Sequence, residues 1–218
     1  MFVCRLFESW QKELQKTDSK QYLEEAQTEI DERSAHEEIM LYGLVLGYAK
    51  MSIEQRMQAL DMFVPKIHNW AVCDSCCMGY KFMEKEQEVW FSYLRKYQNS
   101  SREFEVRFFI VSLLAHYINE AYIEQVLEIL NHTSHEGYYV KMAVAWAVSV
   151  CYVKFPIQTK RLLLANEMDD FTHNKAIQEN PGILSGEQRR KSGIESVKTI
   201  EATGGMCDAS DAFRKKRD

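Results

Sequence analysis

The chain has 218 residues, with 27 Lys or Arg against 32 Asp or Glu, so its formal net charge is -5 at pH 7. Apolar types make up 46% and charged types 27% of the residues, a globular composition that excludes a disordered, collagen-like or purely coiled-coil chain. Only 9 Gly and 3 Pro are present, too few for the frequent turns of a β-sandwich. Composition therefore predicts an all-α protein.

The sequence also bears on where the protein works. No apolar run reaches the roughly 18 residues that a membrane-spanning helix needs, because Lys141 and Ser149 interrupt even the stretch 138–153. The first residues lack the basic, apolar and small-residue layout of a signal peptide. We expect a cytoplasmic protein whose six cysteines are thiols. The net negative charge argues mildly against non-specific nucleic-acid binding, although a local basic surface remains compatible with it.

Helical patterns follow one another along the chain. Residues 6–16 and 21–30 are plausible helices within a weakly specified N-terminal cap, 1–33. Four helix pairs follow, each with apolar residues at helical spacing. They are expected at 34–50 with 52–67, from 70 to 98, from 101 to 131, and at 137–154 with a second helix that begins after Pro156 and runs toward 167.

The pairs recur at a regular interval. They begin at Ser34, Trp70, Arg102 and Gly137, which are 36, 32 and 35 residues apart. A helix-pair period of this length, without strand signals, predicts an α-solenoid of antiparallel helix pairs, the architecture of HEAT-like repeats. We expect residues 1–179 to form this single domain and residues 180–218, which begin Asn-Pro-Gly, to form a disordered or divergent tail.

Three cysteines cluster at Cys73, Cys76 and Cys77, with His68 upstream. A zinc site normally adds a second pair of ligands elsewhere in the chain, and none follows here. We therefore interpret the cysteines as small buried thiols on a packed helix and predict no metal.

A second set combines polar and aromatic residues on the first helices of successive pairs. Trp70 and Asp74 lie four residues apart and share a helix face, while Arg107 and Trp146 lie on the equivalent helices of the next two pairs. Equivalent helices of a solenoid line up side by side, so these residues are candidates for one common surface. The alternative is that both Trp residues are core, that Asp74 caps or pairs locally, and that Arg107 neutralises Glu103.

Four ordered motifs carry a specific resemblance. They are Asn69-Trp70-Ala71-Val72-Cys73-Asp74-Ser75, Glu105-Val106-Arg107-Phe108-Phe109, Tyr138-Tyr139-Val140-Lys141-Met142-Ala143-Val144-Ala145-Trp146 and Thr172-His173-Asn174-Lys175-Ala176-Ile177-Gln178. Together they resemble the DNA alkylation repair family, the AlkD-type HEAT-like repeat DNA glycosylases. The resemblance implies a concave DNA-binding face and hydrolysis of the N-glycosidic bond of cationic N3- and N7-alkylated purines in duplex DNA, as part of base excision repair.

The resemblance also assigns residues. It implies a catalytic set of Trp70, Asp74, Arg107 and Trp146, with Arg107 on a phosphate. It implies DNA contacts from Tyr138, Tyr139, Lys141, His173, Asn174 and Lys175. It implies no cofactor, and in a prokaryote it places the protein at the nucleoid. We expect a monomer.

Such a sparse site suits the reaction, because an alkylated purine is already cationic and leaves neutral without a general acid. The positive sugar must be stabilised instead, and a carboxylate about 4 Å away supplies on the order of 4 kcal/mol at an effective dielectric of about 20.

The sequence departs from the family in two places: residues 1–20 lack its Gly-x-x-x-Pro-x-x-Arg-like stretch, and residues 180–182 break the helical pattern after the last motif. The alternative function is a non-catalytic HEAT-like protein that binds DNA structures or a protein partner, or a purely structural scaffold.

Overall fold

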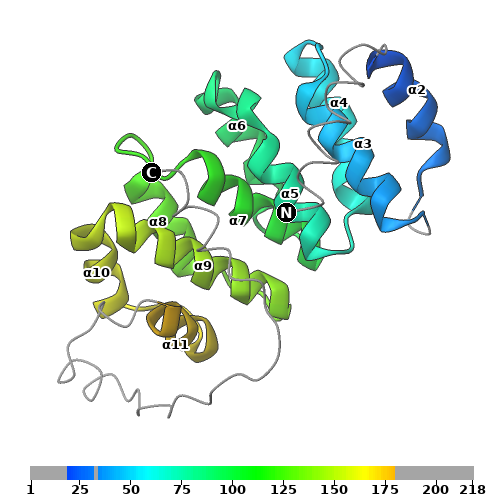
Figure 1. Cartoon of the computed structure of the whole chain (residues 1–218). Coiled ribbons are helices and arrows are strands. Elements are labelled where there is room, and N and C mark those ends of the chain that lie inside the picture. Colours follow the sequence, from blue (N-terminus) through cyan, green and yellow to red (C-terminus); the bar gives the residue numbers. More distant parts are fainter. Residues whose placement is uncertain (1–18, 32–33, 180–218) are drawn as a thin grey trace, which may run out of the picture. The chain divides into compact units, whose positions relative to one another are not determined.

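The computed structural model describes residues 19–31 and 34–179, and every regular element among them is a helix (Figure 1). These residues lie in the first of two units of the chain, residues 1–183. The all-helical prediction is confirmed, and the fold is consistent with an α-solenoid. The predicted helix 6–16 and the predicted tail 180–218 lie outside the described residues.

The helices follow the predicted pairs closely. The first helices are α3 (His36–Tyr48), α5 (Trp70–Gly79), α7 (Glu103–His116) and α9 (Tyr138–Lys154), and the second helices are α4 (Ile53–Phe63), α6 (Gln87–Leu94), α8 (Ile123–His132) and α10 (Pro156–Leu164). They are preceded by α2 (Ser19–Glu29) and followed by α11 (Asp170–Glu179). Short 3-10 helices extend three of the turns: η1 (Val64–Lys66), η2 (Lys81–Glu84) and η3 (Arg95–Tyr97).

Local chemistry explains where several helices begin. At α4, the Ser52 hydroxyl accepts from the Gln55 N–H at 3.2 Å while the Gln55 side chain accepts from the Ser52 N–H at 3.1 Å, a capping box. Asn69 caps α5 by accepting from the Ala71 N–H at 2.7 Å. Pro156 opens α10, where its missing N–H costs nothing because the first helical donors have no partner within the helix.

The first helices pack in chain order, α3 against α5, α5 against α7, α7 against α9 and α9 against α11. Helix α7 lies in the middle of this row, and most of its side chains are buried, including Phe108, Phe109 and Leu113 at 0% exposure. Burial all round is typical of a helix with neighbours on several sides. The row brings the N-terminal turns of α5, α7 and α9 next to one another.

One close helix approach depends on a glycine. A methyl carbon at Gly43 would lie 2.3 Å from Cζ of Phe63 and 2.5 Å from Sγ of Cys76. A glycine at this position therefore lets α3 pack closely against Phe63 and α5.

The three clustered cysteines Cys73, Cys76 and Cys77 are fully buried, and burial raises the pKa of the Cys73 and Cys76 thiols well above the ordinary value. The prediction of buried thiols is confirmed.

No helix in the described part of the chain is long and apolar enough to cross a membrane.

Candidate functional site

The predicted carboxylate and guanidinium form a bidentate ion pair between α5 and α7. Arg107 donates from Nε to Oδ1 of Asp74 at 2.9 Å and from Nη2 to Oδ2 at 2.8 Å. The side chains are 7% and 16% exposed respectively, so the pair is largely shielded from water while the carboxylate keeps an opening to solvent. Planar fork-to-carboxylate pairing of this kind fixes orientation as well as charge.

Arg107 makes a third contact, with the neighbouring helix α9. Its Nη1 donates to the backbone carbonyl of Tyr139 at 2.6 Å, and its guanidinium lies 5.9 Å from the centre of the Tyr139 ring. One side chain thus joins α5, α7 and α9, three helices that follow one another in the row seen in Figure 1. The alternative that Arg107 neutralises Glu103 is wrong, because Glu103 instead accepts from the Tyr139 N–H at 2.6 Å.

The Asp74 carboxylate has capacity left for a ligand. An ionised carboxylate offers about four lone-pair positions, and the described contacts of Asp74 with Arg107 use one on each oxygen. A free lone pair of this partly exposed side chain can accept from a water or lie against a cation. The alternative that Asp74 caps or pairs locally is also wrong, since its partner is 33 residues away.

Exposed aromatic side chains lie at the starts of α5 and α9, the two helices that Arg107 links to α7. Trp70 lies one helical turn before Asp74 and is 51% exposed, so the alternative that it is core is wrong. Tyr138 and Tyr139 are 57% and 37% exposed, with ring centres 5.4 Å apart. Large aromatic side chains left in solvent at one edge of a fold mark a surface that contacts something.

The structure adds two rings that the sequence interpretation missed. Phe104 lies 5.5 Å from Tyr139, and Phe171 lies 5.9 Å from Tyr138, centre to centre. Phe171 directly precedes the Thr172 motif, a position that could have drawn attention to it. Trp146 is half-buried on α9, two turns after Tyr139.

Two of the predicted DNA-binding cations already have acidic neighbours. The ammonium of Lys141, 21% exposed, lies 3.6 Å from Glu136 and 3.7 Å from Asp169. Lys175 pairs with Glu179 at 2.9 Å, one turn later on α11.

The other two predicted DNA contacts on α11 differ. Asn174 is exposed. His173 requires a correction, because its ring is buried and its Nε2 lies 3.1 Å from the carbonyl of Leu163. Burial lowers the pKa of His173, so the ring is a neutral anchor between α11 and α10 and does not face a phosphate.

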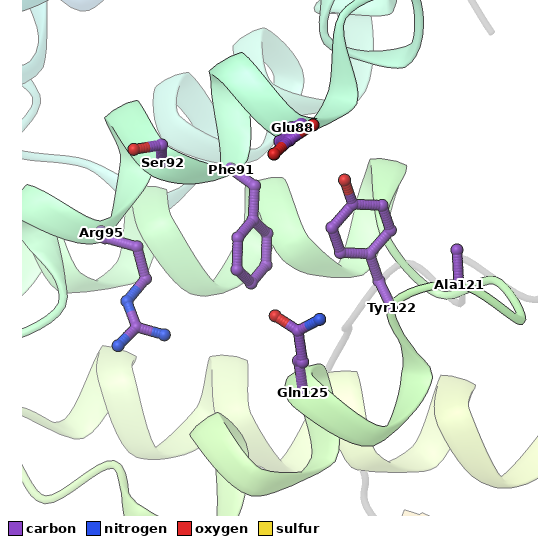
Figure 2. Close-up of a pocket in the computed structure, with 7 residues that line it drawn as sticks. All are labelled: Glu88, Phe91, Ser92, Arg95, Ala121, Tyr122 and Gln125. Atoms are coloured by element: carbon purple, nitrogen blue, oxygen red, sulfur yellow. The ribbon is translucent and has the colours of Figure 1, made fainter.

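A separate groove of about 550 Å³ lies between α6 and the start of α8 (Figure 2). It is lined by Glu88, Phe91, Ser92, Arg95, Ala121, Tyr122 and Gln125. The Phe91 and Tyr122 rings lie 5.1 Å apart in it. The groove contains none of the predicted site residues. Within residues 19–31 and 34–179, no group of three or more His, Cys, Asp or Glu side chains could hold a metal ion.

Comparison with known proteins identifies the family. Residues 3–179 match the family model described as DNA alkylation repair enzyme. The match includes the N-terminal segment without the Gly-x-x-x-Pro-x-x-Arg-like stretch and ends one residue after the last motif. Searches of curated proteins and of solved structures find no match. A role in repair of alkylated DNA, with DNA as partner, follows from the match, and the chain belongs to the DNA alkylation repair family.

Proposed function

We propose that this protein is a DNA glycosylase that hydrolyses the N-glycosidic bond of cationic N3- and N7-alkylated purines in duplex DNA. The observation that carries the proposal is the Asp74 carboxylate, held by Arg107 and open to solvent beside exposed aromatic rings. The DNA would lie along the N-terminal ends of α5, α7 and α9, on the concave face of the solenoid.

The reaction breaks the bond between C1′ of the sugar and the purine nitrogen, and both bonding electrons go to the base. Since the alkylated base begins as a cation, it leaves neutral and the positive charge moves to the sugar. The negative charge of Asp74 stabilises this sugar cation, by on the order of 4 kcal/mol at about 4 Å with an effective dielectric of about 20. That energy corresponds to about a thousandfold in rate. A free lone pair of the same carboxylate orients the water that attacks C1′.

Arg107 acts as a positioning residue in this proposal and not as a phosphate ligand. Three of its N–H groups are engaged by Asp74 and by the Tyr139 carbonyl, and its side chain is only 7% exposed. Moving to a phosphate would break the bonds that orient the catalytic carboxylate. The guanidinium therefore fixes the plane of the carboxylate.

The exposed aromatic residues form the surface against which the sugar of the alkylated nucleotide packs in this proposal. Trp70, one turn from Asp74, presents an exposed ring to the sugar, whose developing charge is attracted by the face of an indole. Tyr138 and Tyr139 extend the aromatic surface on α9, and Trp146 lies further along the same helix.

Contacts to the DNA backbone come from Lys141, Asn174 and Lys175. The two lysines each exchange an acidic neighbour for a phosphate when DNA binds.

The test is release of free base from duplex DNA that contains 7-methylguanine or 3-methyladenine, with wild-type protein and Asp74→Asn side by side. We expect release by wild type and a loss of several hundredfold or more in the variant. Equal release by both proteins would remove Asp74 from the mechanism. No release by wild type, with DNA binding intact, would remove the glycosylase activity.

One observation favours a second candidate, a non-catalytic protein that binds DNA structures. Both oxygens of Asp74 already accept from Arg107, and such a pair would also serve as a purely structural link between α5 and α7. A binder of this kind predicts salt-dependent DNA affinity that Asp74→Asn leaves unchanged, without base release by either protein.

A further inference from the structure

The backbone of Tyr139 is held on both sides of its Cα by helix α7. Its N–H donates to Oε1 of Glu103 at 2.6 Å, and its carbonyl accepts from Nη1 of Arg107 at 2.6 Å. Glu103 and Arg107 are four residues apart on α7, so they lie on the same helix face. These two side chains therefore hydrogen-bond to one residue in the first turn of α9.

Glu103 does the work of a helix cap for its neighbour. The first N–H groups of a helix have no partner within it, and a polar side chain at the preceding position normally satisfies one of them. The residue at that position of α9 is Gly137, which has no side chain to do so. Glu103 from α7 accepts the Tyr139 N–H instead.

Gly137 also leaves the space that Glu103 occupies. A methyl carbon at this position would lie 2.6 Å from Oε1 of Glu103 and 2.7 Å from its Cδ and Cγ. Gly137 has φ of -61°, which any residue adopts, so the requirement is for space and not for an unusual backbone. An alanine here would displace the flexible Glu103 side chain and leave the backbone in place.

We propose that Glu103 is a positioning residue of the site and that Gly137 is the residue that admits it, an inference that rests on the proposed function. Glu103 fixes the backbone of Tyr139 through its N–H, the carbonyl of the same residue fixes Arg107, and Arg107 fixes the carboxylate of Asp74. Glu103 acts on the reaction only through this chain of contacts and does not touch the substrate.

Helix α7 offers a matched control in its own first turn. Glu105 carries the same charge, but its carboxylate accepts from the Ser100 hydroxyl at 2.7 Å and pairs with Arg102 at 3.5 Å. A change at Glu105 therefore alters net charge and the start of α7 without releasing Tyr139.

The first experiment measures single-turnover release of 7-methylguanine by Glu103→Ala, Glu103→Gln, Gly137→Ala and the control Glu105→Ala. We expect Glu103→Ala and Gly137→Ala each to lower the rate at saturating protein about tenfold, which is about 1.4 kcal/mol, without changing the half-saturating concentration. Glu103→Gln retains an oxygen acceptor and falls between wild type and Glu103→Ala. Glu105→Ala stays within about twofold of wild type.

Double variants separate positioning from a general effect on folding. The pair Glu103→Ala with Gly137→Ala is expected to be no slower than either alone, because both remove the same contact. In an Asp74→Asn background, Glu103→Ala changes the rate by less than about twofold, since there is no catalytic carboxylate left to orient. The proposal would be overturned if the rate losses of the two single variants multiplied in either double variant, as the losses of independent sites do.

A second measurement does not depend on activity. The Arg107 Nε–H signal, observed by NMR in the DNA-free protein, exchanges slowly in wild type and in Glu105→Ala, and faster in Glu103→Ala and Gly137→Ala. If wild type releases no base, the proposed function fails, while this signal still tests the contacts. Unchanged exchange in folded Gly137→Ala would overturn the proposal even if Glu103→Ala does not fold.

Discussion

Replacing Arg107 by lysine distinguishes the two roles that have been considered for this side chain. The substitution keeps the positive charge and replaces a planar fork by a compact ammonium. If Arg107 contacts a phosphate, lysine can replace it, and the variant binds DNA more weakly but keeps its maximal rate. If Arg107 orients Asp74, lysine cannot replace it, because an ammonium cannot form two parallel hydrogen bonds to a carboxylate.

The size of the effect follows from the contacts. Arg107 donates to the two oxygens of Asp74 at 2.9 and 2.8 Å, and a lysine keeps about one of these bonds. A hydrogen bond to a charged group contributes about 1.5–3 kcal/mol, which corresponds to a fall of about 10- to 160-fold in rate. A positive charge about 8 Å from the sugar opposes the sugar cation by about 2 kcal/mol. This opposing energy is present in both proteins and cancels from the comparison.

The assay is single-turnover release of 7-methylguanine by wild type and Arg107→Lys across protein concentrations, so that the maximal rate and half-saturation are obtained separately. Arg56→Lys is the control, because Arg56 is buried to a similar extent and binds the carbonyls of Leu46 and Ala49, away from Asp74. We expect a lower maximal rate with unchanged half-saturation for Arg107→Lys only. A rise in half-saturating concentration with an unchanged maximal rate would refute the positioning role and restore the phosphate contact.

Three further predictions concern exposure, titration and packing. Trp70→Ala removes a half-exposed ring, so the free energy of unfolding changes by no more than about 0.5 kcal/mol. Base release slows about 5- to 30-fold, which corresponds to the loss of a cation–π contact of about 1–2 kcal/mol. His173 is buried, and burial lowers its pKa in the folded protein. On acidification the histidine of the unfolded chain therefore binds a proton at a higher pH than that of the folded protein. The free energy of unfolding of wild type falls as the pH drops through about 6.5. Urea unfolding at pH 7.5 and 5.5 will show a smaller loss for His173→Gln. Gly43→Ala places a methyl carbon 2.3 Å from the Phe63 ring and lowers the free energy of unfolding by about 1–3 kcal/mol. In Gly47→Ala the methyl carbon lies 3.0 Å from the nearest atom of Tyr80, so the same urea titration will show a smaller decrease.

The sequence predicted the helix pairs well because the signals for them are local. The Ser52 capping box and the Pro156 start act within one turn of chain, and apolar periodicity needs only a window of residues. The burial of His173 was also within reach, because Thr172, His173, Ala176 and Ile177 form the buried stripe of α11. The motif drew attention to the identity of His173 and away from its place on that stripe.

The contacts of Arg107 were not predictable in the same way. Asp74 lies 33 residues before it and Tyr139 lies 32 residues after it. Which side chains meet across such distances depends on how far neighbouring helices are shifted along one another. A one-residue shift of α9 against α7 would present a different carbonyl to the guanidinium. The sequence therefore named Asp74, Arg107 and Tyr139, which the structure brings together, but the bonds of Arg107 to the other two could not be read from it.

The register that creates this site is fixed by contacts and not by loop length. Helices α3, α5, α7 and α9 begin at residues 36, 70, 103 and 138, which are 34, 33 and 35 residues apart, so the repeats differ slightly in length. Nevertheless the N-terminal turns of α5, α7 and α9 meet, and polar groups link them. Arg107 binds Asp74 on one side, and Glu103 and Arg107 bind the backbone N–H and carbonyl of Tyr139 on the other. Apolar packing alone tolerates small slides of one helix along another, whereas a buried guanidinium with a displaced partner loses a charge-assisted bond. The same contacts that set the alignment of three helices thus hold the carboxylate on which the proposed reaction depends.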